Sequence, residues 1–196
     1  MIPRLILASS SPRRKKILSF LGISFRVVAP RGVVEERKPR ESPRKLVQRL
    51  ALEKATSLRR FYPNTWILGA DTLVVQRGRV YGKPRGIKEA ERTLSLLSGK
   101  SHQVLTGLAL WGPNGQVWTG VGRSRIHFRQ LTQAELKKYI STREPYDKAG
   151  GYDIRGTAGG WIRELEGDYF NVMGLPVNLL LTALDTLGFR QKPRHR

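Results

Sequence analysis

The sequence predicts a mixed α/β fold, in which helices flank a central β-sheet that contains both parallel and antiparallel strands. In the first half of the chain, short apolar runs typical of strands alternate with amphipathic segments typical of helices, which favours parallel pairing. The turn Pro113-Asn114-Gly115 separates two longer apolar runs and predicts a hairpin, whose strands are antiparallel. With 196 residues, of which 39% are hydrophobic, the chain can form a domain with a sizeable core. We expect this single domain at residues 1–189 and a basic tail at 190–196.

The first strand and helix are expected at residues 5–8 and 12–21, with a second strand at 25–29. Ser11 is a typical N-cap, and Pro12 suits the first helical position. Four consecutive cations occupy the first turn of this helix, although the helix dipole repels cations there. Either an anion such as phosphate binds at this turn, or the turn is a solvated basic face. For the first alternative, the candidate ligands are Ser9, Ser11, Arg13 and Arg14.

The next segment is a polar loop at 30–42, which contains Glu35 and Glu36. Ser42 and the proline after it then begin a long helix with an apolar stripe. Lys54 lies on the apolar side of this helix. Its side chain therefore either extends to the edge of the buried surface or points into a polar cleft.

A buried strand is expected at 66–70, ending at Asp71 and followed by the apolar residues 73–75. Because an unpaired buried charge is costly, a carboxylate between two apolar runs is either functional or a turn or cap residue. The pair Arg77-Gly78 predicts a hairpin turn, and the chain after that turn leads to Lys83.

Apolar periodicity and turn residues predict the remaining elements. Ile87 is expected on the buried side of its helix, and a capping box begins the helix after Thr132. The Gly-rich run at 149–160 either lets the backbone approach a ligand closely or is a flexible connector. In order, these elements are a helix at 87–98, strands at 104–111 and 117–128, a helix at 132–140, a strand at 161–165 and a helix at 176–187.

The composition limits the chemistry of the chain. There is no cysteine and there are only three histidines, so a bound metal is expected to be a hard cation held by carboxylates and phosphate oxygens. No apolar run is long enough to span a membrane. The formal net charge of +21 implies attraction to polyanions or to an anionic substrate, and it also favours solubility.

Carboxylates, lysines and an anion-binding helix start, without cysteine or clustered histidine, point to phosphate chemistry. This combination suits the attack of water on a phosphate ester or anhydride with the help of Mg²⁺ or Mn²⁺. The carboxylates would hold the metal and accept a proton, while the lysines and Arg13 would neutralise phosphoryl oxygens. The candidates are Glu35, Glu36, Asp71, Lys54 and Lys83.

A series of ordered motifs extends from Leu5 to about Leu187 and resembles one protein family. These motifs are LILASSSPRR, ESP…LA…KA, GADTLVV, GKP, LSGKSHQVLTG, EPYDKAGGYDIRG and GDYFNVMGLP. They are highly specific together and in this order. By them the chain resembles the Maf (septum-formation-protein-like) nucleoside triphosphate pyrophosphatases, and most closely the branch assigned to dTTP and UTP.

The resemblance implies a fold like that of inosine triphosphatase, with two lobes around a nucleotide-binding cleft. It also implies hydrolysis between the α and β phosphates, a divalent cation such as Mg²⁺ or Mn²⁺, a cytoplasmic location and a homodimer. By motif, Asp71 resembles the proton acceptor that activates water, and Glu36, Lys54 and Lys83 resemble its catalytic companions. Asp71 and Glu36 are then the expected metal ligands, with Glu35 as the alternative glutamate.

Arg13, Thr72 and Arg155 resemble the residues that determine specificity in this family. The dTTP/UTP branch typically has glutamine at the position of Arg155. A glutamine amide both donates and accepts hydrogen bonds, whereas arginine only donates. The resemblance therefore implies the reaction type more firmly than it implies the base.

A basic nucleic-acid-binding module is the alternative function. The high net charge favours it, as do aromatic residues beside cations, such as Phe61-Tyr62 after Arg59-Arg60. Against it, the sequence contains no recognisable RNA-binding motif, and its acidic residues lie where phosphate would approach. As a lesser consequence of the charge, we expect weak non-specific binding to nucleic acid.

Overall fold

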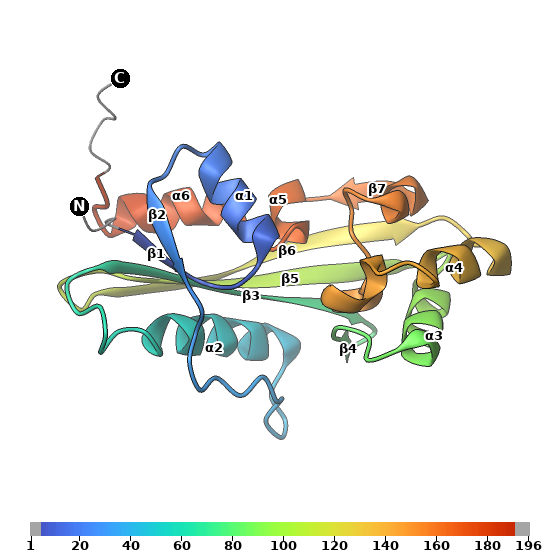
Figure 1. Ribbon diagram of the computed structural model, residues 1–196, viewed down its shortest axis with the longest axis horizontal. Coiled ribbons are helices and arrows are strands. Elements are labelled where there is room, and N and C mark those ends of the chain that lie inside the picture. The colour runs from blue at the N-terminus through green and yellow to red at the C-terminus, as the bar shows by residue number, and fades with distance from the viewer. Residues whose placement is uncertain (1–4, 191–196) are drawn as a thin grey trace.

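The computed structural model describes residues 5–190 and contains a seven-stranded mixed sheet flanked by helices, as predicted (Figure 1). Except for its first residue, the expected tail at 190–196 lies outside the described residues. The strands are β1 (Leu5–Ala8), β2 (Phe25–Val28), β3 (Trp66–Gln76), β4 (Arg79–Tyr81), β5 (Ser101–Trp111), β6 (Val117–Phe128) and β7 (Ile162–Glu166). The α-helices are α1 (Pro12–Phe20), α2 (Pro43–Thr56), α3 (Ile87–Leu97), α4 (Gln133–Ile140), α5 (Tyr169–Val172) and α6 (Val177–Thr186). Three 3₁₀ helices, η1 (Glu144–Asp147), η2 (Ala149–Gly151) and η3 (Thr157–Trp161), lie between α4 and β7.

The strand order is β2-β1-β3-β5-β6-β7, and β4 pairs with β3. The pairs β1–β2 and β1–β3 are parallel, whereas β3, β5, β6 and β7 pair in antiparallel fashion. The prediction that a strand ends at Asp71 is wrong, because β5 pairs with β3 without interruption from Ile67 to Val75. Asp71 therefore lies in the middle of a long strand rather than in a turn.

One edge of β3 is open at the position of Asp71 and Thr72. Parallel pairing with β1 ends at Gly69, and antiparallel pairing with β4 begins only at Val74. The carboxyl end of β1 faces this gap. Ligands of α/β proteins commonly bind at the carboxyl ends of strands where neighbouring strands diverge. The sheet topology thus places two predicted site residues at such an edge.

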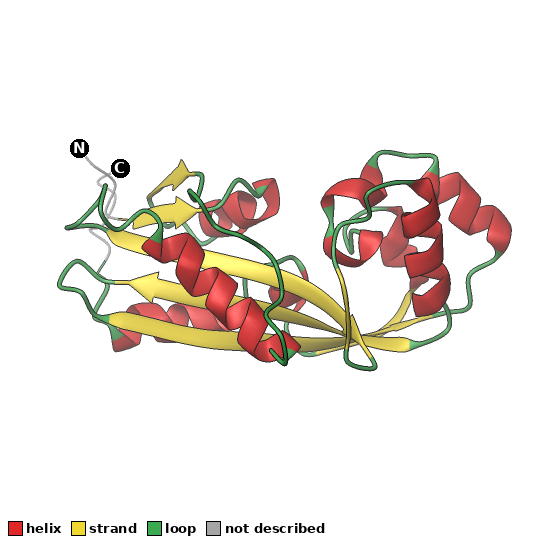
Figure 2. Cartoon of the chain, turned by 90° about the horizontal axis from the view of Figure 1, so that it is seen from below, coloured by secondary structure: helices red, strands yellow, loops and turns green. Residues whose placement is uncertain are grey.

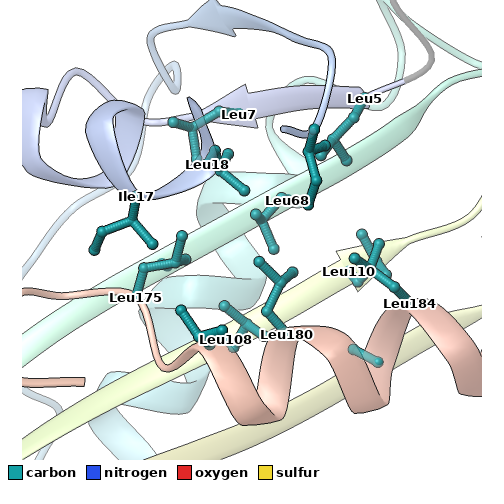
Figure 3. Packing of buried hydrophobic residues seen from close by; sticks show 14 of the residues in the cluster. Leu5, Leu7, Ile17, Leu18, Leu68, Leu108, Leu110, Leu175, Leu180 and Leu184 are labelled. Carbon is teal, nitrogen blue, oxygen red and sulfur yellow. The ribbon is translucent and has the colours of Figure 1, made fainter. Parts of the chain in front are cut away.

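The main core lies between the sheet and the helices α1 and α6. Ile17 and Leu18 from α1, Leu68 from β3, and Leu180 and Leu184 from α6 converge there (Figure 3). On the opposite face of the sheet, α2 packs and buries its predicted apolar stripe (Figure 1). No helix among the described residues is long and apolar enough to cross a membrane.

The helices α3 and α4 and the 3₁₀ helices form a second lobe at the far end of the long strands (Figure 2). Its core contains Ala90, Leu94 and Leu97, so the predicted apolar face of α3 is correct there. The prediction that Ile87 is buried is wrong, because its side chain is 65% exposed. The first turn of α3 extends beyond the neighbours that cover the rest of the helix. The capping box of Thr132 at the start of α4 is confirmed.

Two glycines allow α2 to lie directly on the sheet. A Cβ atom on Gly69 of β3 would lie 2.2 Å from the carbonyl oxygen of Ala51. A Cβ atom on Gly107 of β5 would lie 2.1 Å from the carbonyl oxygen of Val47. Both neighbours are helix backbone rather than flexible side chains. This close approach fixes the depth at which Lys54 of the same helix enters the sheet edge.

Candidate active site

A cleft of about 640 Å³ lies at the carboxyl end of β1 and along the open edge of β3. It is bounded by the start of α1, the middle of α2, the loop before α2 and the segment around η2. Nine of the ten residues predicted for the site line it: Ser9, Ser11, Arg13, Arg14, Lys54, Asp71, Thr72, Lys83 and Arg155. Glu36 does not line it, whereas Glu35 does.

Lys54 lies at the centre of this cleft, between two carboxylates. Its Nζ donates to Asp71 Oδ1 at 2.6 Å and lies 2.5 Å from Glu35 Oε1. Lys54 and Asp71 are only 8% and 7% exposed. The side chain of Lys54 thus points into a polar cleft, which is the second of its two predicted orientations. A buried charge requires such partners, because removing it from water without them is costly.

The two carboxylates differ in their electrostatic environment. Burial raises the pKa of Asp71, and the nearby charges of Lys54 and Arg14 oppose that effect. Burial also acts to raise the pKa of Glu35, but the hydrogen bond and charge of Lys54 outweigh it and lower this pKa. A raised pKa makes a carboxylate a stronger base, so Asp71 is better suited than Glu35 to accept a proton.

The carboxylate of Glu36 is exposed and lies outside the cleft lining, so the structure puts Glu35, not Glu36, beside Lys54. Glu36 instead uses its backbone carbonyl oxygen, which accepts a hydrogen bond from Arg49 Nη2 at 2.9 Å. The loop 30–42 has no regular period that would distinguish two consecutive glutamates in the sequence. Contacts with α2 decide which of the two faces the cleft.

Arg49 anchors this loop to α2. Its Nε and Nη2 donate to the two carboxylate oxygens of Glu41 at 2.7 and 2.9 Å, and its Nη1 donates to Glu53. The hydrogen bond from Arg49 lowers the pKa of Glu41 to about 2, against an ordinary value of 4.5. The pair therefore contributes stability above about pH 4.5 and loses that contribution as the pH falls toward 2.

The start of α1 forms one wall of the cleft. Ser11 caps the helix by accepting from the backbone N–H of Arg14 at 3.5 Å, as predicted. Ser9 Oγ accepts from the backbone N–H of Ser11 and from Arg14 Nη1, each at 3.1 Å. Lys15 and Lys16 are exposed. Only the first two of the four consecutive cations line the cleft.

The two arginines of this turn differ in their contacts. The guanidinium of Arg14 is buried and donates to Gly174 O at 2.8 Å and to Thr72 Oγ1 at 3.0 Å, in addition to Ser9. Arg13 is less buried, and its nearest carboxylate is that of Asp153, at 3.9 Å. Arg14 thus brings a fixed positive charge to the cleft wall, whereas Arg13 keeps donors free for a ligand.

Thr72 begins a chain of buried polar groups behind the cleft. Its Oγ1 lies 3.1 Å from Thr106 Oγ1, and Thr106 donates to the backbone oxygen of Asn171. The Asn171 side chain donates in turn to Val104 O and to Ser124 Oγ, each at 3.0 Å. Sequence reasoning assigned no role to these partners of Thr72. The one available indication in the sequence was an asparagine among apolar residues, and the structure shows that this Asn171 is fully buried.

Asp153 holds Arg155 at the far end of the cleft. Its Oδ1 accepts from the backbone N–H and Nε of Arg155 at 3.0 and 3.1 Å, and its Oδ2 accepts from Nη2 at 2.7 Å. The side chain of Asp153 is buried. Sequence reasoning did not assign it a role, although a carboxylate in a Gly-rich run two residues before an arginine was an available indication.

The Gly-rich run is an ordered wall of the cleft rather than an irregular connector. It folds into η2 and η3, and the backbone N–H of Gly150 donates to Gly82 O at 2.9 Å. Gly150 has φ of +72°, and a Cβ atom there would lie 2.7 Å from Val74 of β3. Lys148, which precedes this run, also lines the cleft and donates to Glu144 O at 3.0 Å.

The charge of the cleft suits an anionic ligand with a divalent cation. Lysines and arginines outnumber carboxylates among the lining residues. The part of the chain that the structure describes contains no cluster of three or more carboxylate, histidine or cysteine side chains that could hold a metal alone. Asp71 and Glu35 nevertheless converge on one Lys54 Nζ. Mg²⁺ typically binds one or two carboxylates together with waters and substrate phosphates, and this pair fits that requirement.

Known proteins match this chain over nearly its whole length. The dTTP/UTP pyrophosphatase of Geobacillus sp. (strain WCH70) is 43% identical over 186 residues, which cover 95% of this chain and 99% of the relative. The dTTP/UTP pyrophosphatase of Symbiobacterium thermophilum is 45% identical over 186 residues and covers 95% of each chain.

Among solved structures, the Staphylococcus aureus Ham1 protein is similar in fold. It superposes with a TM-score of 0.52 over 93% of this chain and 98% of its own, at 11% sequence identity. The family model described as Maf-like protein matches residues 4–187. From the extent of that match and the identity of its relatives, the chain belongs to the Maf-like protein family.

Proposed function

We propose that this protein hydrolyses a nucleoside triphosphate between the α and β phosphates, releasing a nucleoside monophosphate and pyrophosphate. The observation on which this depends is the buried Lys54–Asp71 pair, joined by the more exposed carboxylate of Glu35, in a cleft lined by cations. The names of the relatives support dTTP and UTP, or modified pyrimidine nucleotides, as the substrates.

Asp71 is the proton acceptor in this proposal. Its burial raises its pKa, which strengthens it as a base, while the charge of Lys54 acts in the opposite direction and favours the ionised form. Lys54 also fixes the direction of the carboxylate, because its Nζ is 2.6 Å from Oδ1 and leaves Oδ2 for a water molecule. The water then attacks one phosphorus of the α–β anhydride as its proton passes to Asp71. The bond from that phosphorus to the bridging oxygen breaks, and this oxygen leaves with the other phosphorus, which gives the monophosphate and pyrophosphate.

The cations of the cleft stabilise the charge that develops on the phosphoryl oxygens. Arg13, Lys83 and the N–H groups at the start of α1 are the donors that line the cleft beside the carboxylates. Arg14 acts from behind them as a fixed charge, because its own hydrogen bonds are made within the protein. We propose Ser9 and Ser11 as the residues that shape this phosphate-binding turn.

Asp71 and Glu35 would hold the divalent cation, Mg²⁺ or Mn²⁺. When bound with substrate, such a cation neutralises phosphate oxygens and lowers the pKa of a coordinated water. Lys54 Nζ lies within 2.6 Å of an oxygen of each carboxylate, so it holds the two side chains close together, as a site with two protein ligands requires.

Arg155 and Thr72 form the base-reading part of the cleft in this proposal, while Arg13 serves the phosphates. Asp153 fixes the guanidinium of Arg155, so that side chain presents only donors. The two ring carbonyl oxygens of uracil and thymine are acceptors and suit these donors. A turnover screen over canonical and modified nucleoside triphosphates, with pyrophosphate as the measured product, tests this preference. Turnover confined to bases without a ring carbonyl would contradict it.

The two consecutive glutamates provide a matched test of the site. Glu35→Gln is expected to reduce kcat by about 10²-fold or more, because it removes the second carboxylate from Lys54. Glu36→Gln is expected to change kcat by less than about twofold, because the side chain of Glu36 is exposed and its backbone contact with Arg49 persists. Both rates are measured as pyrophosphate release with Mg²⁺ or Mn²⁺. A larger loss of kcat in Glu36→Gln than in Glu35→Gln would exclude Glu35 as a residue of the active site.

Arg49→Met tests the anchoring of the loop that contains Glu35. We expect kcat/KM to fall about tenfold and the backbone amides of residues 30–42 to exchange faster with deuterium, because Glu41 and Glu36 of the loop lose their hydrogen bonds from Arg49. Lys45→Met, which removes an exposed cation from the same helix, is the control and should change neither quantity. Equal effects of the two substitutions would exclude the anchoring role.

We further propose that the protein acts as a homodimer in the cytoplasm, as the family resemblance implies. Analytical ultracentrifugation of the purified chain tests the first statement. Fractionation of the source cells tests the second. Weak non-specific nucleic-acid binding remains the expected consequence of the net charge of +21.

A further inference from the structure

A second hollow, of about 410 Å³, lies on the face of the sheet that α2 covers only in part. It is bounded by the start of α2, the β3–β4 turn, and the adjoining ends of β5 and β6. None of its lining residues lines the cleft described above. They are Ser42, Pro43, Arg44, Val75, Gln76, Arg77, Gly78, Ser101, His102, Gln103, Leu105 and Arg125.

The charges of this hollow all have one sign. Arg44, Arg77 and Arg125 line it, all three are exposed, and no carboxylate is among the lining residues. Within the described part of the chain, the side chains of Arg44 and Arg77 make no hydrogen bond or ion pair. Arg125 lies 3.3 Å from Glu166, but both of these side chains are about half exposed, so solvent weakens the pair.

The floor of the hollow is neutral and offers hydrogen bonds. Val75 and Leu105 form its apolar part, and Gln76 and Gln103 add amide groups. Gln76 is only 8% exposed, yet the hydrogen bond that its Nε2 donates to Ser101 O is long, at 3.4 Å. A nearly buried amide with so weak a partner retains hydrogen-bonding capacity toward the hollow.

The backbone holds Arg77 in place at the rim. Its φ is +48°, in the left-handed region that glycine and asparagine occupy far more readily than arginine. The following residue, Gly78, also has positive φ, so the two form the tight turn between β3 and β4. On β6, Arg123 is the cross-strand partner of Leu105 and lies two residues from Arg125, so the exposed cations continue along that strand.

We propose that this hollow and the arginines at its rim bind the phosphodiester backbone of nucleic acid. Three separate guanidinium groups around an open surface suit phosphates spaced along a polymer. Among the lining residues there is no Phe, Tyr or Trp on which a base could stack, so binding depends on phosphate contacts and has little sequence preference. The inference does not rest on the proposed reaction, because the two sites share no residue.

The test uses two variants of equal charge. One replaces Arg44, Arg77 and Arg125 with glutamine, and the other replaces the exposed Lys137, Lys138 and Arg143 of the second lobe with glutamine. Each lowers the net charge of +21 by three. Anisotropy of a labelled single-stranded deoxyadenosine oligonucleotide is measured over a range of salt concentrations. Each titration is run both without and with a saturating non-hydrolysable dTTP analogue that occupies the active-site cleft.

We expect the first variant to bind at least about tenfold more weakly than the unmodified chain, and the second to bind nearly as tightly. The slope of log K against log salt should fall by about 2 in the first variant only, since each single-strand phosphate contact contributes about 0.7. Equal weakening in both variants would mean that diffuse charge alone attracts the oligonucleotide. Loss of binding in the presence of the analogue would assign the oligonucleotide to the active-site cleft, and either result would overturn the proposal.

Pyrophosphate release by the same preparations separates this inference from the proposed function. Both variants should retain the turnover and the melting temperature of the unmodified chain. Unchanged values of these two quantities would show that both variants are folded. If neither the unmodified chain nor the variants hydrolyse nucleotide, but the first variant still binds the oligonucleotide more weakly than the second, the proposed reaction is contradicted and the proposed binding surface is supported. Inorganic pyrophosphate is also added at a phosphate concentration equal to that of the oligonucleotide. If it displaces the oligonucleotide, the hollow is a site for small anions and the proposal of a nucleic-acid surface is overturned.

Discussion

Asp71→Asn is expected to reduce kcat by about 10²- to 10⁴-fold while leaving the melting temperature nearly unchanged. The substitution preserves the size of a side chain that is only 7% exposed, but an amide cannot accept a proton from water. Lys54 retains Glu35 as an ionic partner, so no unpaired charge remains in the core. The loss should therefore affect catalysis rather than folding.

The measurement is steady-state pyrophosphate release with saturating dTTP or UTP and Mg²⁺. Asp185→Asn is the control, because Asp185 is an exposed carboxylate on α6 whose pair with Arg190 is also exposed. Nucleotide binding by the Asp71 variant is measured separately by calorimetry without metal. An unchanged kcat in the Asp71 variant would exclude the role of proton acceptor.

Gly107→Ala is expected to destabilise the protein by about 3 kcal/mol, a larger effect on stability than we expect from any of the site substitutions. The added Cβ atom would lie 2.1 Å from Val47 O and 2.6 Å from the carbonyl carbon of the same residue. A helix backbone cannot rotate away as a side chain can, so α2 must move outward from the sheet. For a chain of this length, about 3 kcal/mol corresponds to a decrease of about 6–12 °C in melting temperature.

Thermal unfolding followed by circular dichroism measures this effect. Gly86→Ala is the control, because a Cβ atom there meets nothing within 4 Å and its φ of 174° is ordinary extended backbone. The outward movement of α2 should also reduce kcat, since Lys54 belongs to the same helix. A melting temperature equal to that of the control would show that α2 does not rest on Gly107.

The elements that could be predicted from the sequence are those with strong local determinants. Ser11, Ser42 and Thr132 cap their helices as expected, because an N-cap depends on contacts within four residues. The β5–β6 hairpin formed at its predicted turn. The continuity of β3 through Asp71 could not be predicted, since it depends on nine consecutive pairings with β5, which is distant in the sequence.

The site shows the same division between local and distant determinants. The residues that line the cleft follow from ordered motifs, and nine of the ten predicted residues do line it. Glu36 does not, because contacts between Arg49 and the loop 30–42 decide which glutamate reaches Lys54. Likewise, the contact of Thr72 with Thr106 joins two strands that meet only in the folded sheet, so no local pattern indicated it.

The long strands that pass through both lobes have a consequence for how the molecule unfolds and moves. Leu68 and Val74 of β3 lie in the cores of different lobes, and so do Leu108 and Val104 of β5. Neither lobe can therefore melt without removing strands from the other, and we expect a single cooperative unfolding transition. Closure of the cleft over a ligand would then occur by bending and twisting of continuous strands rather than by rotation about a flexible linker.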